Sequence, residues 1–133
     1  MKIKVYLCGP MSDIPQHNIP LFETATADLR RRGFDVVAPH ELDDPLERAS
    51  SLASPDGAMP REAWAARLSR DLLRLVTDGV QAVVVLPGWE HSKGASLETY
   101  VAYRLYGLPI VDFETLIQVP ASDLDQAHLQ IHA

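Results

Sequence analysis

Four short apolar runs alternate along the chain with longer segments in which apolar residues recur every three or four positions. The short runs occupy residues 3–8, 34–39, 82–86 and 108–113. Continuous apolar runs of this length, bounded by turns, are typical of strands that are buried on both faces. The longer segments are predicted to be amphipathic helices. Strands that alternate with helices predict an α/β fold with a parallel sheet of four to five strands and helices on both faces.

The predicted helices cover residues 19–32, 61–77 and 94–106. Asn18 is placed to cap the first of them, because asparagine is a favoured N-cap residue. Pro60 fits the first turn of the second helix, where its missing N–H costs no hydrogen bond.

Two segments lack a clear period and are expected to be less regular. Residues 40–60 are polar, with three prolines and several serines, and are predicted to be a long loop. Loops of this length often act as lids or binding loops. Residues 114–133 are predicted to form a C-terminal extension with a short helix near 122–128. The length of 133 residues favours one domain over 1–133.

The charge and composition of the chain indicate which kinds of binding partner to expect. The net charge is −6 and the pI about 5.2, and the densest basic run, at 30–32, ends a predicted helix. This argues against a nucleic-acid polymer as partner. No apolar stretch is long enough for a signal peptide or a membrane span, so we expect a cytoplasmic protein without membrane contact. The single cysteine, Cys8, allows no internal disulfide. Scattered histidines predict no metal site, and we expect no cofactor.

Two carboxylates interrupt the apolar stripes of the predicted helices. On the helix at 94–106, Glu98 shares a face with small and apolar positions, and on the helix at 61–77, Asp71 shares one with Trp64 and Leu68. A lone buried carboxylate is costly, so such groups pair or shift their pKa. Asp71 is placed to pair with Arg67 or Arg74, and Glu98 to accept hydrogen bonds from the turn at 92–96. The alternative is that the two acids form a site.

The turns after the first and third strands also favour a site. They read "GPMSD" and "PGWEHSKGAS" and lie at the carboxyl edge of the predicted sheet, where ligands of such folds bind. Ser92 and the N–H groups near Gly94 are placed either to seat a phosphate or simply to cap the helix. Trp89 is placed to stack on a base or to pack beneath its turn. One carboxylate as nucleophile and a second as proton donor is the chemistry of glycosidic bond cleavage.

Three segments together resemble one family. "VYLCGPMSDIPQHNIPLFETATADLRRRGFDVVAP", "SRDLLRLVTDGVQAVVVLPGWEHSKGASLE" and "AYRLYGLPIV" are similar to the nucleoside 2-deoxyribosyltransferase-like superfamily, over about residues 3–112. The closest likeness is to a small bacterial and phage branch with the "GPM" and "LPGWE" turns. It is related to nucleoside 5′-monophosphate N-glycosidases. The resemblance implies a Rossmann-like or flavodoxin-like three-layer sandwich and a homodimer or higher homo-oligomer.

The resemblance also implies roles for individual residues. Glu98 matches the family's nucleophile and Asp71 its assisting acid, while Ser92 and Gly94 match the phosphate-binding turn. The turn Gly9-Pro10-Met11-Ser12 matches the substrate loop of the "GPM" branch. The monophosphate hydrolases have a serine and an arginine in this loop, where this chain has Pro10 and Ser12.

From these features we predict an enzyme that cleaves the N-glycosidic bond of a nucleoside or nucleoside 5′-monophosphate. A covalent glycosyl intermediate on Glu98 would pass the sugar to water or to a second base. Two alternatives remain open at this stage. One is a nucleotide-binding or sensing module without turnover, and the other is a glycohydrolase that acts on NAD or a related nucleotide.

Overall fold

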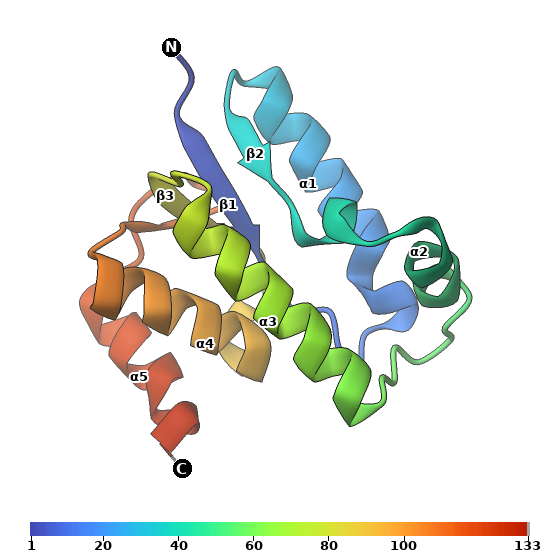
Figure 1. Cartoon of the computed structure of the whole chain (residues 1–133). Coiled ribbons are helices and arrows are strands. Elements are labelled where there is room, and N and C mark those ends of the chain that lie inside the picture. The colour runs from blue at the N-terminus through green and yellow to red at the C-terminus, as the bar shows by residue number, and fades with distance from the viewer. Residues whose placement is uncertain (133) are drawn as a thin grey trace.

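The computed structural model describes residues 1–132 and contains a four-stranded, fully parallel sheet (Figure 1). The strands are β1 (Lys4–Cys8), β2 (Asp35–Val37), β3 (Ala82–Val85) and β4 (Ile110–Asp112). Their order is β2-β1-β3-β4. The predicted α/β three-layer sandwich is therefore confirmed.

Successive strand residues point to opposite faces of the sheet. Because the strands carry apolar side chains on both faces, helices cover both of them. One face is covered by α1 (Ile19–Arg31), and the other by α3 (Arg61–Thr77), α4 (Lys93–Tyr100) and α5 (Ala121–His132). Figure 1 shows the last three helices side by side in front of the strands. In β1, Val5 and Leu7 pack against α1, whereas Tyr6 and Cys8 point toward the α3–α4 side. This alternation decides which β1 residues can reach the cleft described below.

The segment 40–60 is not a loop throughout, so that prediction is wrong in part. It contains helix α2 (Pro45–Leu52), preceded by a short 3₁₀ helix at Pro39–Leu42. The Asp44 side chain accepts the Glu47 N–H, and the Glu47 side chain accepts the Asp44 N–H. This reciprocal capping box, with Pro45 in the first turn, is a helix-start signal that the sequence carried. Two further short 3₁₀ helices lie at Pro15–Asn18 and Trp89–His91.

The expected cap at Asn18 is also absent. Its side chain makes no hydrogen bond to the N-terminus of α1, and its Nδ2 instead donates to the Pro10 carbonyl at 2.9 Å. Asn18 has a left-handed backbone with φ of 60°, as do Asp13, Gln16 and His17 before it. A left-handed residue directs its side chain away from the usual capping position. Asn18 therefore holds the turn after β1 in place.

The predicted helix 94–106 changes its pitch partway along. After α4, residues Val101–Leu105 form a π-helical segment, and Gly107 follows with φ of 66°. Glu98 and Ala102 are buried as predicted, but Leu105 is 66% exposed. The wider π turn adds a residue per hydrogen-bonded ring, which rotates later positions off the 3.6-residue stripe. The C-terminal helix α5 is longer than predicted and packs along α4.

The strand order also places a switch point in the sheet. From β1 the chain moves to β2 on one side, whereas β3 lies on the other side of β1. In open α/β sheets, ligands bind where the connections diverge in this way, at the carboxyl ends of the strands.

No helix in the described residues is both long and apolar enough to cross a bilayer.

Candidate functional site

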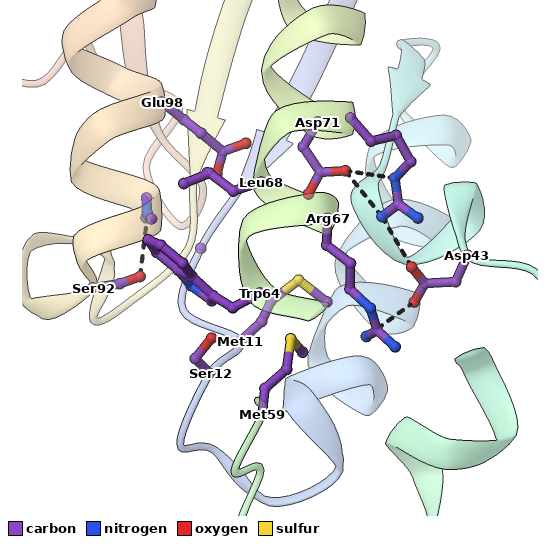
Figure 2. Close-up of a pocket in the computed structure, with 14 residues that line it drawn as sticks. Met11, Ser12, Asp43, Met59, Trp64, Arg67, Leu68, Asp71, Ser92 and Glu98 are labelled. Carbon is purple, nitrogen blue, oxygen red and sulfur yellow. Dashed lines mark hydrogen bonds and ion pairs between the residues drawn. The ribbon is translucent and has the colours of Figure 1, made fainter. Parts of the chain in front are cut away.

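A narrow cleft opens at the switch point, between the carboxyl ends of β1 and β3 and the helices α3 and α4 (Figure 2). Its free volume is about 50 Å³. The cleft brings together residues from segments far apart in the sequence, namely Gly9, Met11 and Ser12 after β1, Trp64, Leu68 and Asp71 on α3, and Ser92, Gly94 and Glu98 at α4.

Glu98 lies at the buried end of this cleft, with 6% of its surface exposed. The Tyr6 hydroxyl donates a hydrogen bond to Glu98 Oε2. The Cys8 thiol lies 3.7 Å from Oε1 and 3.6 Å from the Ala95 carbonyl. Because Tyr6 and Cys8 are two apart on β1, both side chains reach the same carboxyl group. The carboxyl of Glu98 is therefore fixed in direction by two groups of one strand.

Burial controls the protonation of the two acids. The pKa of Glu98 is raised to about 8, mainly by burial and also by the charge of Asp71, while the hydrogen bonds from Tyr6 and Cys8 oppose this rise. The pKa of Asp71 is raised to about 6, again mainly by burial, while Arg70 opposes the shift. Burial also raises the pKa values of Tyr6 and Cys8, which keeps both as donors. Between pH 6 and 8 the pair of acids therefore holds about one proton.

Asp71 pairs with Arg70, its neighbour in sequence. The Arg70 Nε and Nη2 donate to Asp71 Oδ1 at 3.1 and 3.0 Å. The predicted partners Arg67 and Arg74 are wrong, since Arg74 pairs with Asp78 and Arg67 turns toward α2. Only one oxygen of Asp71 is used in the Arg70 contact, and Asp71 lines the same cleft as Glu98. The two predicted acids are thus brought together.

The two turns form the other end of the cleft. The Ser92 side chain accepts the Ala95 N–H at 3.2 Å, so it caps α4 and also lines the cleft. An added Cβ on Gly9 would lie 2.9 Å from Leu86 Cβ, which explains why only glycine fits where the turns after β1 and β3 meet. Glu98 accepts no hydrogen bond from the 92–96 turn; its partners are on β1.

Two predicted site residues lie outside the cleft. Trp89 is 6% exposed and packs in the core cluster with Cys8 and Val85, because its short 3₁₀ helix turns the indole under the turn. Pro10 also does not line the cleft; its carbonyl accepts from Asn18 and its ring faces Gly88. The predicted contacts of Trp89 and Pro10 with substrate are therefore corrected to structural roles.

Several residues at the cleft were not predicted from the sequence as part of a site. Tyr6 and Cys8 read as ordinary core positions, and their contact with Glu98 depends on how α4 crosses β1. Asp43 and Met59 reach the cleft from the segment predicted as a loop, and Arg67 reaches it from α3. The signal available for Asp43 was the capping box that follows it, since this fixes the entry of the chain into α2.

A wider cavity of about 510 Å³ adjoins the cleft and shares Ser12, Met59, Trp64, Ser92 and Gly94 with it. Its own walls carry Asp13, Arg61, His91 and Lys93. The basic side chains and the N-terminus of α4 make this outer cavity the more electropositive part of the site. In the described residues, no three His, Cys, Asp or Glu side chains gather as metal ligands would.

Comparisons with known proteins agree with the fold and do not describe an activity. A family model described as "Domain of unknown function (DUF4406)" matches residues 3–112. No curated protein matches the chain. A crystal structure of a conserved protein from Enterococcus faecalis V583 is similar, with a TM-score of 0.55 and 19% identity, over 84% of this chain. This chain spans 63% of that protein's length, so the likeness shows the fold alone.

Proposed function

This chain belongs to the family described as a domain of unknown function (DUF4406), and from its cleft we propose that it cleaves the N-glycosidic bond of a nucleoside 5′-monophosphate. The observation that carries the proposal is the pair Glu98 and Asp71 in one narrow cleft at the switch point of the sheet. A buried carboxyl that is oriented by two donors and faces a second acid is suited to nucleophilic attack on a sugar carbon.

In the proposed reaction, ionised Glu98 attacks the anomeric carbon, and a new C–O bond forms as the C–N bond breaks. The bonding electron pair leaves with the base nitrogen, which takes a proton from protonated Asp71. Water, or a second base, then attacks the anomeric carbon and releases Glu98. The proton of that nucleophile returns to Asp71, so the cycle closes without any other reactant.

The outer cavity supports a phosphate on the sugar. Arg61 and Lys93 line it beside Ser92 at the N-terminus of α4. A 5′-phosphate there would meet cations and free helix N–H groups, whereas the inner cleft holds three carboxylates. The inner cleft is smaller than a typical ligand pocket of about 300 Å³ or more, so substrate entry requires side chains such as Met11 and Met59 to move.

The direct test is release of free base from a panel of ribo- and deoxyribonucleosides and their 5′-monophosphates, with and without an acceptor base. We expect base release from monophosphates, and a covalent sugar adduct on the intact protein by mass spectrometry. New nucleoside formed with the acceptor would identify transfer. Binding of a nucleotide without release of any base would show that the protein is a binding module and not an enzyme of this class. Release of nicotinamide from NAD, with no base released from the other compounds, would show that NAD and not a nucleoside 5′-monophosphate is the substrate.

Tyr6→Phe tests how Glu98 is held. Loss of a hydrogen bond to a charged group costs about 1.5–3 kcal/mol, so we expect kcat/KM to fall roughly 10-fold or more. Because the Tyr6 hydroxyl lowers the pKa of Glu98, its removal should also move the upper limb of the pH profile, near pH 8, to higher pH. Tyr106→Phe, at an exposed position, is the matched control. A lower rate with an unmoved pH limb would show that Tyr6 acts only through packing.

A further inference from the structure

We propose that Arg67 and Asp43 recognise the edge of the base, and that they select bases with two adjacent hydrogen-bond acceptors beside one donor. Guanine, hypoxanthine and cytosine have this pattern, whereas adenine and uracil do not. The inference rests on the proposed function, since it assigns the part of the same cleft that lies beyond the sugar.

The first step is the contrast between two neighbouring arginines on α3. Arg70 is firmly paired, with Asp43 at 2.9 Å and Asp71 at 3.0 Å. Arg67 lies 3.8 Å from Asp43 and 3.5 Å from Glu47, beyond good hydrogen-bond range. Within the described residues, its guanidinium makes one hydrogen bond, from Nη1 to Ser51 Oγ at 3.0 Å. Arg67 therefore keeps most of its five donors for a ligand.

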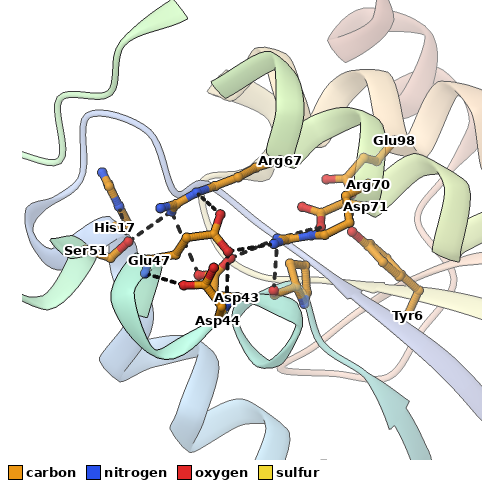
Figure 3. Close-up of polar contacts among 11 residues, drawn as sticks. Tyr6, His17, Asp43, Asp44, Glu47, Ser51, Arg67, Arg70, Asp71 and Glu98 are labelled. Carbon is orange, nitrogen blue, oxygen red and sulfur yellow. Dashed lines mark hydrogen bonds and ion pairs between the residues drawn. The ribbon is translucent and has the colours of Figure 1, made fainter. Parts of the chain in front are cut away.

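Asp43 supplies the matching acceptor. Its side chain is 1% exposed and lines the cleft beside Arg67 (Figure 3). Neither oxygen makes a well-directed hydrogen bond within the described residues, although Oδ1 is ion-paired with Arg70. Because a buried carboxylate normally has its acceptor sites filled, Oδ2 is suited to a ligand N–H. The guanidinium fork and this oxygen thus present two donors and one acceptor side by side.

The position of the pair fits the base rather than the phosphate. Figure 2 shows Arg67 and Asp43 at the side of the cleft away from Ser92, with Asp71 between them and Glu98. The phosphate end is the outer cavity with Arg61 and Lys93. A dianionic phosphate at Arg67 would lie against the carboxylates of Asp43 and Glu47, which repel it. A neutral base has no such conflict.

The ligand class follows from hydrogen-bond geometry. The fork of an arginine suits two adjacent acceptors, as in its bidentate contact with O6 and N7 of guanine. The next atom along that edge, N1–H, would donate to Asp43. Cytosine offers O2 and N3 as acceptors beside its amino group, which gives the same order. On adenine and uracil a donor interrupts the acceptor pair, so one contact of the fork is lost.

The test measures binding of 5′-monophosphates of guanine, hypoxanthine, cytosine, adenine and uracil to the Glu98→Gln protein by calorimetry, so that turnover does not interfere. We expect the first three to bind about 5- to 150-fold more tightly, the range for one bidentate base contact. Adding Arg67→Lys should remove this preference, because lysine keeps the charge but not the fork. Ser51 does not line the cleft, but its hydroxyl accepts the hydrogen bond from Arg67 Nη1. Ser51→Ala removes this bond and should keep the preference for guanine, hypoxanthine and cytosine.

Each opposite result overturns the inference. Equal binding of all five bases, or a preference that survives Arg67→Lys, would show that Arg67 does not contact the base. Loss of the preference in Ser51→Ala would show that Arg67 acts through the position of α2. The matching nucleosides are measured in the same way: if Arg67→Lys weakens binding of all five monophosphates but of none of the nucleosides, Arg67 holds phosphate. These outcomes concern binding, whereas failure of the proposed function would appear as absent base release by the wild-type protein.

Discussion

Glu98→Gln is expected to abolish base release, with kcat lowered by roughly 10⁴-fold or more, as for other removed nucleophiles. Glutamine has nearly the same volume and still offers an oxygen to the Tyr6 hydroxyl, but it cannot form a stable ester with the sugar. The measurement is steady-state base release together with mass spectrometry of the intact protein. We expect the sugar adduct in the wild-type protein and none in the variant.

The same substitution should change the pH dependence of stability. Because burial raises the pKa of Glu98 from 4.5 to about 8, the folded state favours its protonated form. The stability that this group contributes is complete below pH 4.5 and is lost as the pH rises through 8. Glutamine stays neutral, so the Tm of the variant should fall less over this window than that of the wild type.

Glu90→Gln is the matched control, because Glu90 is an exposed carboxylate on the turn that precedes α4. It should leave both base release and the Tm profile unchanged. If Glu98→Gln keeps more than about a tenth of the wild-type kcat in a folded protein, Glu98 is not the nucleophile, since that corresponds to only about 1.4 kcal/mol of barrier.

The sequence predicted the sheet and the position of the cleft because both follow from periodic patterns. Apolar runs defined the strands, and the stripe of Trp64, Leu68 and Asp71 correctly identified the face of α3 that lines the cleft. The "LPGWEHSKGASLE" turn led to Glu98 because a carboxylate on an apolar helix face is a rare pattern. Each of these signals is local in the chain, so no tertiary contact had to be known.

The sequence could not predict contacts between side chains that depend on how the helices and strands are placed relative to one another. Tyr6 reaches Glu98 across 92 positions of the chain, and Asp43 meets Arg67 only because α2 packs beside α3. Trp89 was ambiguous for the same reason, since a turn tryptophan can point into a cleft or under its own loop. In the structure the indole packs under its loop, in the core cluster with Cys8 and Val85.

Asp71→Asn is expected to change the shape of the pH profile as well as the rate. In the wild type, the reactive form has ionised Glu98 and protonated Asp71. It is the minor one of the two singly protonated forms, because the higher pKa of Glu98 keeps most of the shared proton there. With pKa values of about 6 and about 8 for the two acids, kcat/KM should fall below the lower and above the upper value. Below the lower limb both acids are protonated, so no form with ionised Glu98 is available, and above the upper limb no proton remains for the leaving base.

In Asp71→Asn the alkaline limb should disappear, because the site no longer has to keep a proton on Asp71 for the leaving base, and kcat should fall roughly 10²- to 10⁴-fold with loss of the general acid. The acid limb should report Glu98 alone, with its pKa lower than in the wild type because the charge of Asp71 no longer raises it. Asp78→Asn, at the C-cap of the same helix and paired with Arg74, should keep both limbs. A variant that keeps its alkaline limb would assign the proton to another group, and the most direct alternative would be the Tyr6 hydroxyl, which already contacts Glu98.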